Sequence, residues 1–311
     1  MLAFWILVAV LFVGWVVVNL PRKRSDGELV ECHPYRRILP YIMTGRNESI
    51  VLYEDHVKAE ALLDFLPRAR AALGSDVDLT HCLVAAVARG LRDNPKMSQF
   101  IAGKRIYRRK HIDITFSMKR KRLDREAKLA AVKLRFAGDE PFRDTCARVN
   151  AKVAVERSDE KTYTDRELDL FLRLPRPLLS LGIRLLRWAD HHNLLPASFI
   201  ENDGFYCSTF IANLGSLGMS AGFHHLYEYG TCPLFMMVGR IEERPWVEEG
   251  KVVVRKILPL RFSYDERIDD GLTARGGIDT VHHALEHPDE VFGPLPAPDA
   301  PAAHGLGLTS S

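Results

Sequence analysis

The sequence predicts a mixed α/β domain in which helices cover at least one face of a mixed β-sheet. Three observations lead to this prediction. Residues 79–91 carry Leu and Val at helical spacing, and Asn94-Pro95 ends the pattern. Residues 105–118 alternate apolar and polar side chains, which is typical of a strand. Helical and strand patterns keep intermixing toward the C-terminal end, as in residues 246–264, which indicate a hairpin turning at Glu249-Gly250.

Further elements follow from the same two periodicities. The predicted elements are a strand over 205–211, a buried strand over 234–238 and a helix over 277–286. His287-Pro288 is expected to end the helix, because Pro cannot continue it.

The composition narrows the class of protein. A chain of 311 residues with 47% hydrophobic and 27% charged residues has ample material for a buried core. A formal net charge of +3 is too small to indicate a nucleic-acid partner, and none is expected. The five cysteines are scattered and form no C-x-x-C pair, which argues against a disulfide scaffold and a metal site and favours a reducing compartment.

Residues 2–20 form an apolar run in which Asn19 is the only strongly polar side chain. At ~1.5 Å per residue this run spans nearly the ~30 Å hydrocarbon layer. We therefore expect a single transmembrane anchor at residues 1–20. Pro21-Arg22-Lys23-Arg24 follows directly, and the positive-inside tendency then places the N-terminus outside and the domain in the cytoplasm.

The rest of the chain divides by composition. Residues 21–35 are expected to be a polar linker, and residues 36–292 to be the folded domain. Residues 293–311 are rich in Pro, Ala and Gly and are expected to be a disordered tail.

Several motifs resemble one protein family. Residues 263–271 read Ser-Tyr-Asp-Glu-Arg-Ile-Asp-Asp-Gly, which is similar to the S-x-D-H-R-x-x-D-G signature of the 2-oxoacid dehydrogenase acyltransferases (dihydrolipoyl acyltransferases). Residues 210–215 look like the T-I-S-N-L-G motif of that family, and residues 284–289 like its closing helix. The helix over 79–91 with Asn94-Pro95 looks like its A-L-x-x-x-P segment. The resemblance covers most of residues 36–292.

This resemblance implies a fold and an assembly. The family is structurally related to chloramphenicol acetyltransferase, so the implied fold is a mixed-sheet sandwich with helices, here preceded by one transmembrane helix. It also implies a homotrimer with three sites, each between neighbouring subunits.

The resemblance also assigns roles to individual positions. Glu266 stands where the family has its general base, a histidine, and Ala212 stands where a serine donates to the oxyanion. Loss of one oxyanion donor typically costs ~10²–10³ in rate. Asp270, which in the family holds the active-site loop through an ion pair, is retained. Asn213 and Gly271 are retained as well, and with Ala212 they are assigned to substrate binding.

Two interpretations of the missing catalytic histidine stay open. Glu266 is an atypical base if burial makes it more basic, or else it is a solvated or salt-bridged side chain, with Arg267 as one partner. His225, oriented by Glu228, is a second candidate for a displaced base, the alternative being a hydrogen-bonding role of the 222–230 segment across a subunit contact. The pairs His191-His192 and His282-His283 are expected to be solvated.

Two basic stretches also have alternative readings. Residues 104–125 contain ten Lys or Arg and are either a solvated basic face or a surface for phosphates, such as an anionic membrane leaflet. Residues 174–195 are basic and amphipathic, which fits a membrane interface or a helix packed on the domain.

The predicted function is thioester-dependent acyl transfer, from acyl-coenzyme A or an acyl carrier, at an atypical site without the catalytic histidine. The alternative is a catalytically inactive trimeric scaffold or acyl-thioester-binding pseudoenzyme. No bound cofactor is expected, and a lipoyl-bearing hairpin and a peripheral-subunit-binding domain are missing from the sequence. Their absence argues against service as the core of a 2-oxoacid dehydrogenase complex.

Overall fold

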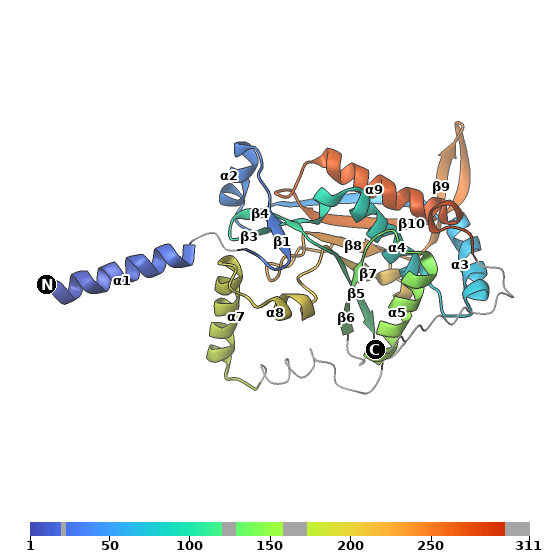
Figure 1. Ribbon diagram of the computed structural model, residues 1–311. Helices are drawn as coiled ribbons and strands as arrows, with labels where there is room; N and C mark the ends of the chain where they lie inside the picture. Colours follow the sequence, from blue (N-terminus) through green and yellow to red (C-terminus); the bar gives the residue numbers. More distant parts are fainter. Residues whose placement is uncertain (20–22, 120–128, 158–172, 296–311) are drawn as a thin grey trace, which may run out of the picture.

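The computed structural model describes residues 1–19, 23–119, 129–157 and 173–295 (Figure 1). Within these ranges the chain builds one large mixed sheet, one small sheet and a set of helices. Helices α3, α4, α5 and α9 lie with the large sheet, and α2 and α7 lie with the small one (Figure 1). Helix α8 contacts the large sheet, where Lys133 of β6 donates to the Ile200 carbonyl at 2.8 Å. Helix α1 projects away from the rest (Figure 1).

The large sheet has seven strands, in the order β2-β10-β8-β7-β5-β6, with β9 paired to β10 beside this path. Pairings β5–β7 and β7–β8 are parallel, and the other pairings are antiparallel. The mixed sheet predicted from the sequence is therefore confirmed. Its strands are β2 (Ile50–Lys58), β5 (Ile112–Lys119), β6 (Leu129–Phe136), β7 (Thr209–Asn213), β8 (Leu234–Val238), β9 (Glu242–Glu248) and β10 (Lys251–Asp265).

The predicted hairpin turns where the sequence indicated. Strands β9 and β10 are joined by Glu249 and Gly250, which have φ values of 49° and 77°. Two consecutive positive φ values match the twist of a tight hairpin, and Gly adopts them without strain.

The predicted strand over 105–118 is in fact two strands in different sheets. Strand β4 (Arg105–Arg109) lies in the small sheet, whose order is β1 (Gly27–Leu29), β4, β3 (Gln99–Ala102), whereas β5 lies in the large one. Buried Arg109 ends β4 by donating to Asp26 and to the hydroxyl of Thr231, both at 2.9 Å. These long-range contacts separate the two strands, and no local pattern reports them.

The segment expected to be a linker, residues 21–35, contributes to the fold. Strand β1 pairs with β4, and the guanidinium of Arg24 is buried. Its nitrogen atoms lie 2.7 Å from Asp26 and 2.8 Å from Asp190, so the chain is fastened to the domain from Arg24 onward.

The helices confirm most of the predicted positions. Helix α4 (Leu79–Asp93) covers the predicted 79–91, and the side chain of Asp78 caps it by accepting from the Thr80 N–H at 2.9 Å. Helix α9 (Gly271–Glu286) begins earlier than expected, because Asp270 supplies a cap there. The other helices are α2 (Pro34–Ile42), α3 (Glu60–Leu73), α5 (Phe142–Arg157), α7 (Arg176–His191), α8 (Ala197–Asn202), α10 (Pro288–Phe292) and the 3₁₀ turns η1 (Pro95–Ser98) and η2 (Leu214–Leu217).

The two faces of the large sheet are packed differently. One face carries the main core, built from α3, α4, α5 and α9 against residues such as Ile211, Met236 and Leu260. The alternate residues of β7 and β8 point to the other face. They form a smaller cluster there with the residues Cys207, Phe210, Ala212, Leu226, Cys232, Phe235 and Met237. Ala212 therefore faces away from the helix layer.

The predicted membrane anchor is wrong in this structure. Helix α1 (Leu2–Asn19) is the described helix that covers the predicted span. Among the residues described, no helix combines the length and apolarity that a membrane crossing needs. The span at residues 1–20, and with it the outside N-terminus and the cytoplasmic domain, is thereby contradicted.

The predicted tail falls mostly on residues 296–311, which lie outside the described residues. Leu295 is described and packs against the main core, so the folded part of the chain extends past the predicted boundary at residue 292.

His282 on α9 is held between two carboxylates instead of being solvated. Its Nδ1 lies 2.8 Å from Asp55 on β2, and its Nε2 lies 3.2 Å from Glu286. The hydrogen bond with Asp55 raises the pKa of His282. The protonated ring therefore fastens α9 to the edge strand of the sheet.

His282→Gln is expected to lower the free energy of unfolding by on the order of 1 kcal/mol at pH 5–6. Because the folded-state pKa is raised, the stabilisation is complete below the unfolded pKa of ~6.5 and is lost as the pH rises through the folded value. Urea unfolding at a series of pH values measures this. His283→Gln is the matched control, since its ring is half exposed and pairs only with exposed Glu290. A His282 effect that is independent of pH would contradict the argument.

Candidate active site

The turn that follows β10 is held by a buried ion pair. The Arg267 guanidinium lies 2.7 Å from the carboxylate of Asp265, which is fully buried. Ser49 donates its hydroxyl to the same carboxylate at 2.9 Å, and Arg267 also donates to the Met43 carbonyl at 2.9 Å. The turn is thereby tied to the segment that leads into β2.

Glu266 occupies the exposed tip of this turn. Its backbone N–H donates to the Ser49 carbonyl at 2.8 Å, but its side chain is exposed and makes no hydrogen bond or ion pair within the described residues. The salt bridge with Arg267 does not form, because that guanidinium turns to Asp265. In a single chain Glu266 also lacks the burial that makes a carboxylate more basic.

Asp270 holds the end of the turn. Its Oδ1 accepts from the Thr273 N–H at 3.1 Å, which caps α9, and its Oδ2 lies 3.4 Å from Arg36 on α2. The Thr273 N–H, assisted by the charge of Arg36, holds the pKa of Asp270 below its ordinary value. Asp270 therefore has an ion-pair partner in Arg36, and its role in an active site stays a prediction.

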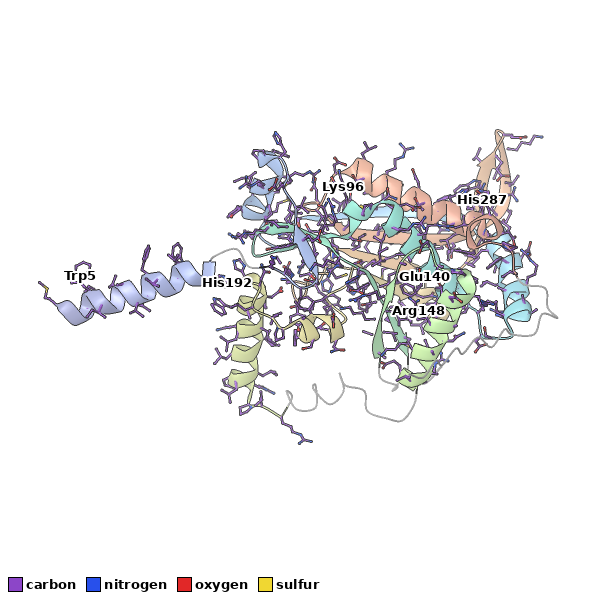
Figure 2. All side chains as sticks on the ribbon, in the orientation of Figure 1. Trp5, Lys96, Glu140, Arg148, His192 and His287 are labelled. Atoms are coloured by element: carbon purple, nitrogen blue, oxygen red, sulfur yellow. The ribbon has the colours of Figure 1, made fainter. Side chains whose placement is uncertain are left out.

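Asp269 strengthens this anchorage. It lies 3.0 Å from Arg36 and 3.5 Å from Lys96, which is labelled in Figure 2. Gly271 begins α9, and a Cβ added there would meet no atom within 4 Å. A single chain therefore gives no steric reason for a glycine at this position.

Ala212 and Asn213 lie at the end of β7. Ala212 is buried, and its methyl group offers no hydrogen-bond donor. The Asn213 side chain accepts from the Ser216 N–H at 3.1 Å and so begins η2. In a single chain this amide oxygen shapes the turn.

The strand register separates Ala212 from Glu266. Ala212 pairs with Met237, which pairs with Arg261, so these three residues form one row across the sheet. Strand β10 ends at Asp265, four residues or ~13 Å along the strand beyond Arg261, and Glu266 lies in the turn just past that end. The two positions therefore cannot act on one small reacting group within a single chain.

The His224-His225 pair packs on the face opposite the helices. The His224 ring stacks on Phe235 with centroids 4.0 Å apart, and the His225 ring stacks on His224 at 4.6 Å. Glu228 does not orient His225, since its carboxylate accepts from the backbone and side chain of Asn47, both at 3.1 Å. His225 is exposed at the outer end of the stack.

The basic stretch 104–125 is not one continuous solvated face in its described part. Arg109 is buried in the ion pair with Asp26, and Lys104 lies over the Tyr41 ring at 4.8 Å. Residues 120–125 lie outside the described residues. Amphipathic helix α7 (Arg176–His191), within the predicted 174–195, leaves no residue buried.

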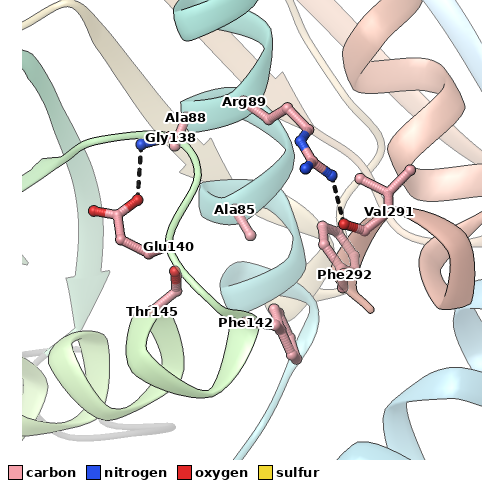
Figure 3. Close-up of a pocket in the computed structure, with 9 residues that line it drawn as sticks. All are labelled: Ala85, Ala88, Arg89, Gly138, Glu140, Phe142, Thr145, Val291 and Phe292. Carbon is pink, nitrogen blue, oxygen red and sulfur yellow. Dashed lines mark hydrogen bonds between the residues drawn. The ribbon is translucent and has the colours of Figure 1, made fainter. Parts of the chain in front are cut away.

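The described part of the chain contains no cluster of three or more His, Cys, Asp or Glu that could hold a metal ion. A cavity of about 340 Å³ lies between α4, α10 and the segment before α5 (Figure 3). Its charged groups are already engaged: Arg89 donates to the Val291 carbonyl, and Glu140 accepts from the Gly138 N–H at 2.7 Å. None of the candidate site residues lines it.

Several residues that hold this site could not be identified from the sequence alone. Arg36 and Ser49 lie more than 200 residues before the turn that they support. Asp265 and Arg267 belong to the motif itself, but only the structure shows that they pair with each other. A local pattern has no means of reporting the long-range contacts.

Comparison with known proteins gives one family. Residues 201–293 match the family described as 2-oxoacid dehydrogenases acyltransferase (catalytic domain). A 55-residue stretch is 47% identical to the lipoamide acyltransferase component of the branched-chain alpha-keto acid dehydrogenase complex of Pseudomonas aeruginosa. That stretch is 18% of this chain and 13% of the relative, so the chain matches only a small part of its length.

The fold extends the likeness to most of the chain. The cubic core of the pyruvate dehydrogenase multienzyme complex matches with a TM-score of 0.55 and 18% identity, over 84% of this chain and 93% of that one. A chloramphenicol acetyltransferase matches with a TM-score of 0.50 and 11% identity, over 83% and 99%. The predicted chloramphenicol acetyltransferase-like fold is therefore confirmed, without the transmembrane helix. Residues 201–293 are therefore similar to the catalytic domain of the 2-oxoacid dehydrogenase acyltransferases, as the motifs predicted.

Proposed function

We propose that the chain binds acyl thioesters at a site between copies of a homotrimer, and that acyl transfer there is slow. The proposal is carried by the strand register, which puts Ala212 in the row of Arg261, ~13 Å along β10 from the strand end that bears the Glu266 turn. A site that uses both positions needs Glu266 from one copy and Ala212 from another.

Exposed apolar side chains support such a contact. Leu217, Met219 and Phe223 follow Ala212 in the chain and are each about half exposed. Of the three, Phe223 lies on the sheet face of Ala212, since the Arg261 guanidinium, from the same row as Ala212, is 5.5 Å from its ring. A second copy laid over this face would bury them beside Ala212, and the related cubic core shows that this fold assembles.

The chemistry follows from the two positions. In acyl transfer a base takes the proton of an acceptor thiol or hydroxyl while the acceptor oxygen or sulfur attacks the thioester carbonyl. The resulting oxyanion needs a donor, which Ala212 does not supply. Glu266 would be the base, and coenzyme A or carrier thioesters would be the acyl donors, with no lipoyl group on this chain.

A second candidate function is a catalytically inactive trimeric scaffold that still binds acyl thioesters. The exposed and unpaired carboxylate of Glu266 favours this candidate. Thioester binding is expected of both functions, so only a measured rate of acyl transfer distinguishes them.

Light scattering of the full chain at micromolar concentration should give a mass three times that of one chain. Met219→Glu should shift this mass toward the monomer, because it places a charge in the proposed contact. Val252→Glu, on the exposed β9–β10 hairpin, is the matched control and should leave the trimer intact. A wild-type monomer would remove the composite site.

Acetyl transfer from acetyl-coenzyme A to a dithiol should be slow or undetectable for the wild type. The double variant Glu266→His with Ala212→Ser should raise the rate by about 10² or more, because it supplies both a base and an oxyanion donor. Strong wild-type activity that Glu266→Gln leaves unchanged would defeat this assignment. His225→Ala would then test the displaced base.

Mixed trimers test whether the site lies between copies. Co-expressed Glu266→His chains and Ala212→Ser chains should be more active than either variant alone. If the copies assort at random, the mixture should reach roughly a quarter of the rate of the double variant. Activity confined to the double variant would place both groups in one chain and contradict the proposal.

A further inference from the structure

The fold brings together two cysteines that are far apart in the sequence. Cys207 lies two residues before β7, and Cys232 lies two residues before β8. These strands pair in parallel with Phe210 opposite Phe235, and the same register places Cys207 opposite Cys232. Both cysteines belong to the small cluster on the sheet face opposite the main core. The pair is made by strand register, so no C-x-x-C spacing indicates it in the sequence.

The two segments remain adjacent where the cysteines lie. The Thr231 N–H donates to the Phe205 carbonyl at 2.9 Å, so the chains already run side by side before the strands begin. Neighbouring strands are ~4.8 Å apart, and disulfides join Cα atoms that are about 4.4–6.8 Å apart. The thiols of Cys207 and Cys232 also hydrogen-bond to each other. The backbone therefore has the separation that a disulfide needs.

The surroundings make the two thiols chemically different. Burial acts to raise the pKa of the Cys207 thiol, but hydrogen bonds with Cys232 and Thr115 oppose it. The charges of Arg109 and Lys133 act in the same direction as these hydrogen bonds, and the pKa of Cys207 is held below its ordinary value. Burial and the neighbouring Cys207 raise the pKa of Cys232 well above its ordinary value. Because the thiolate is the nucleophile, Cys207 is the member of the pair that reacts first.

The position of the pair limits which oxidant can reach it. Cys207 and Cys232 are 0% and 3% exposed, which excludes a bulky disulfide reagent. The Lys133 ammonium lies close enough to Cys207 for their charges to interact, and the Lys133 side chain is partly exposed. The pair is therefore one side chain away from solvent. A hydroperoxide little larger than water is the oxidant that matches this access.

A second pair of cysteines in the main core provides a comparison. Cys82 and Cys146 also lie near each other. Burial raises the pKa of Cys82 well above its ordinary value and that of Cys146 to about 12. Neither thiol of this pair is therefore activated, although both are as deeply buried as Cys207 and Cys232.

We propose that Cys207 and Cys232 are a redox-sensitive pair that a small hydroperoxide oxidises to an intramolecular disulfide. The Cys207 sulfur attacks one peroxide oxygen and the O–O bond breaks, which leaves a sulfenic acid on Cys207. The departing hydroxide combines with the Cys207 proton to form water. The Cys232 sulfur then attacks the Cys207 sulfur, and the S–O bond breaks. The released hydroxide takes the Cys232 proton, so two thiols lose two electrons and hydrogen peroxide becomes two water molecules.

The experiment treats the folded full chain with hydrogen peroxide, blocks the remaining thiols and digests the chain without reduction for mass spectrometry. A peptide pair joined through Cys207 and Cys232 should appear, with the loss of two hydrogen atoms. Cys82 and Cys146 should remain thiols under the same treatment. No joined peptide under conditions that oxidise the thiols of the urea-unfolded chain would overturn the proposal, as would equal cross-linking of Cys82 with Cys146.

Single variants test the order of the two steps. Cys232→Ser should leave Cys207 as a sulfenic acid, seen as the gain of one oxygen atom, because no second thiol is present to resolve it. Cys207→Ser should slow the oxidation of Cys232 about tenfold or more relative to Cys207 in the wild type, since the remaining thiol is protonated. Oxidation of Cys232 in Cys207→Ser at the wild-type rate would contradict the assigned roles.

Discussion

The buried ion pair between Asp265 and Arg267 fixes the end of β10, the longest of the described strands. Asp265 is the last residue of β10, which pairs with β2, β8 and β9. Removing one partner of a buried pair typically costs 3–5 kcal/mol, because the other charge is left uncompensated. The hydroxyl of Ser49 and the carbonyl of Met43 complete the hydrogen bonds of this pair. The start of α9 and the orientation of the Glu266 turn follow from that endpoint.

The backbone of the turn is held by hydrogen bonds and ion pairs, whereas the Glu266 side chain has no such partner among the described residues. Arg36 and Lys96 neutralise Asp269, and Asp270 caps α9, so each acidic group around Glu266 has a cationic or backbone partner. Glu266 alone projects without one among the described residues. A side chain held by its backbone and left free at its tip is suited to a partner from another copy.

The two faces of the sheet explain why a single chain is an incomplete site. Helices α3, α4, α5 and α9 cover one face with the main core, whereas the other face carries a small cluster and the stack of His224 on Phe235. Ala212 lies on this second face, far along the strands from Glu266.

The sequence by itself determined the mixed α/β class, helix α4, strand β8 and the β9–β10 hairpin. Each of these elements is encoded by local periodicity and by turn residues such as Glu249 and Gly250. It also determined the family resemblance, because the motifs in residues 210–215 and 263–271 are contiguous. The apolar run at residues 2–20 was predicted to cross a membrane, whereas no helix among the described residues combines the length and apolarity that a crossing needs.

Only the tertiary structure decided the contacts between distant segments. It placed Arg36 on Asp270, Asp55 on His282 and Arg24 on Asp190, which lie 166 to 234 residues apart in the chain. It divided residues 105–118 between two sheets and set the separation of Ala212 from Glu266 through the strand register. Local patterns report which face of an element is apolar, whereas ion pairs and registers depend on which elements pack together. Which elements pack together depends on how side chains from the whole chain are buried, so no single segment encodes it.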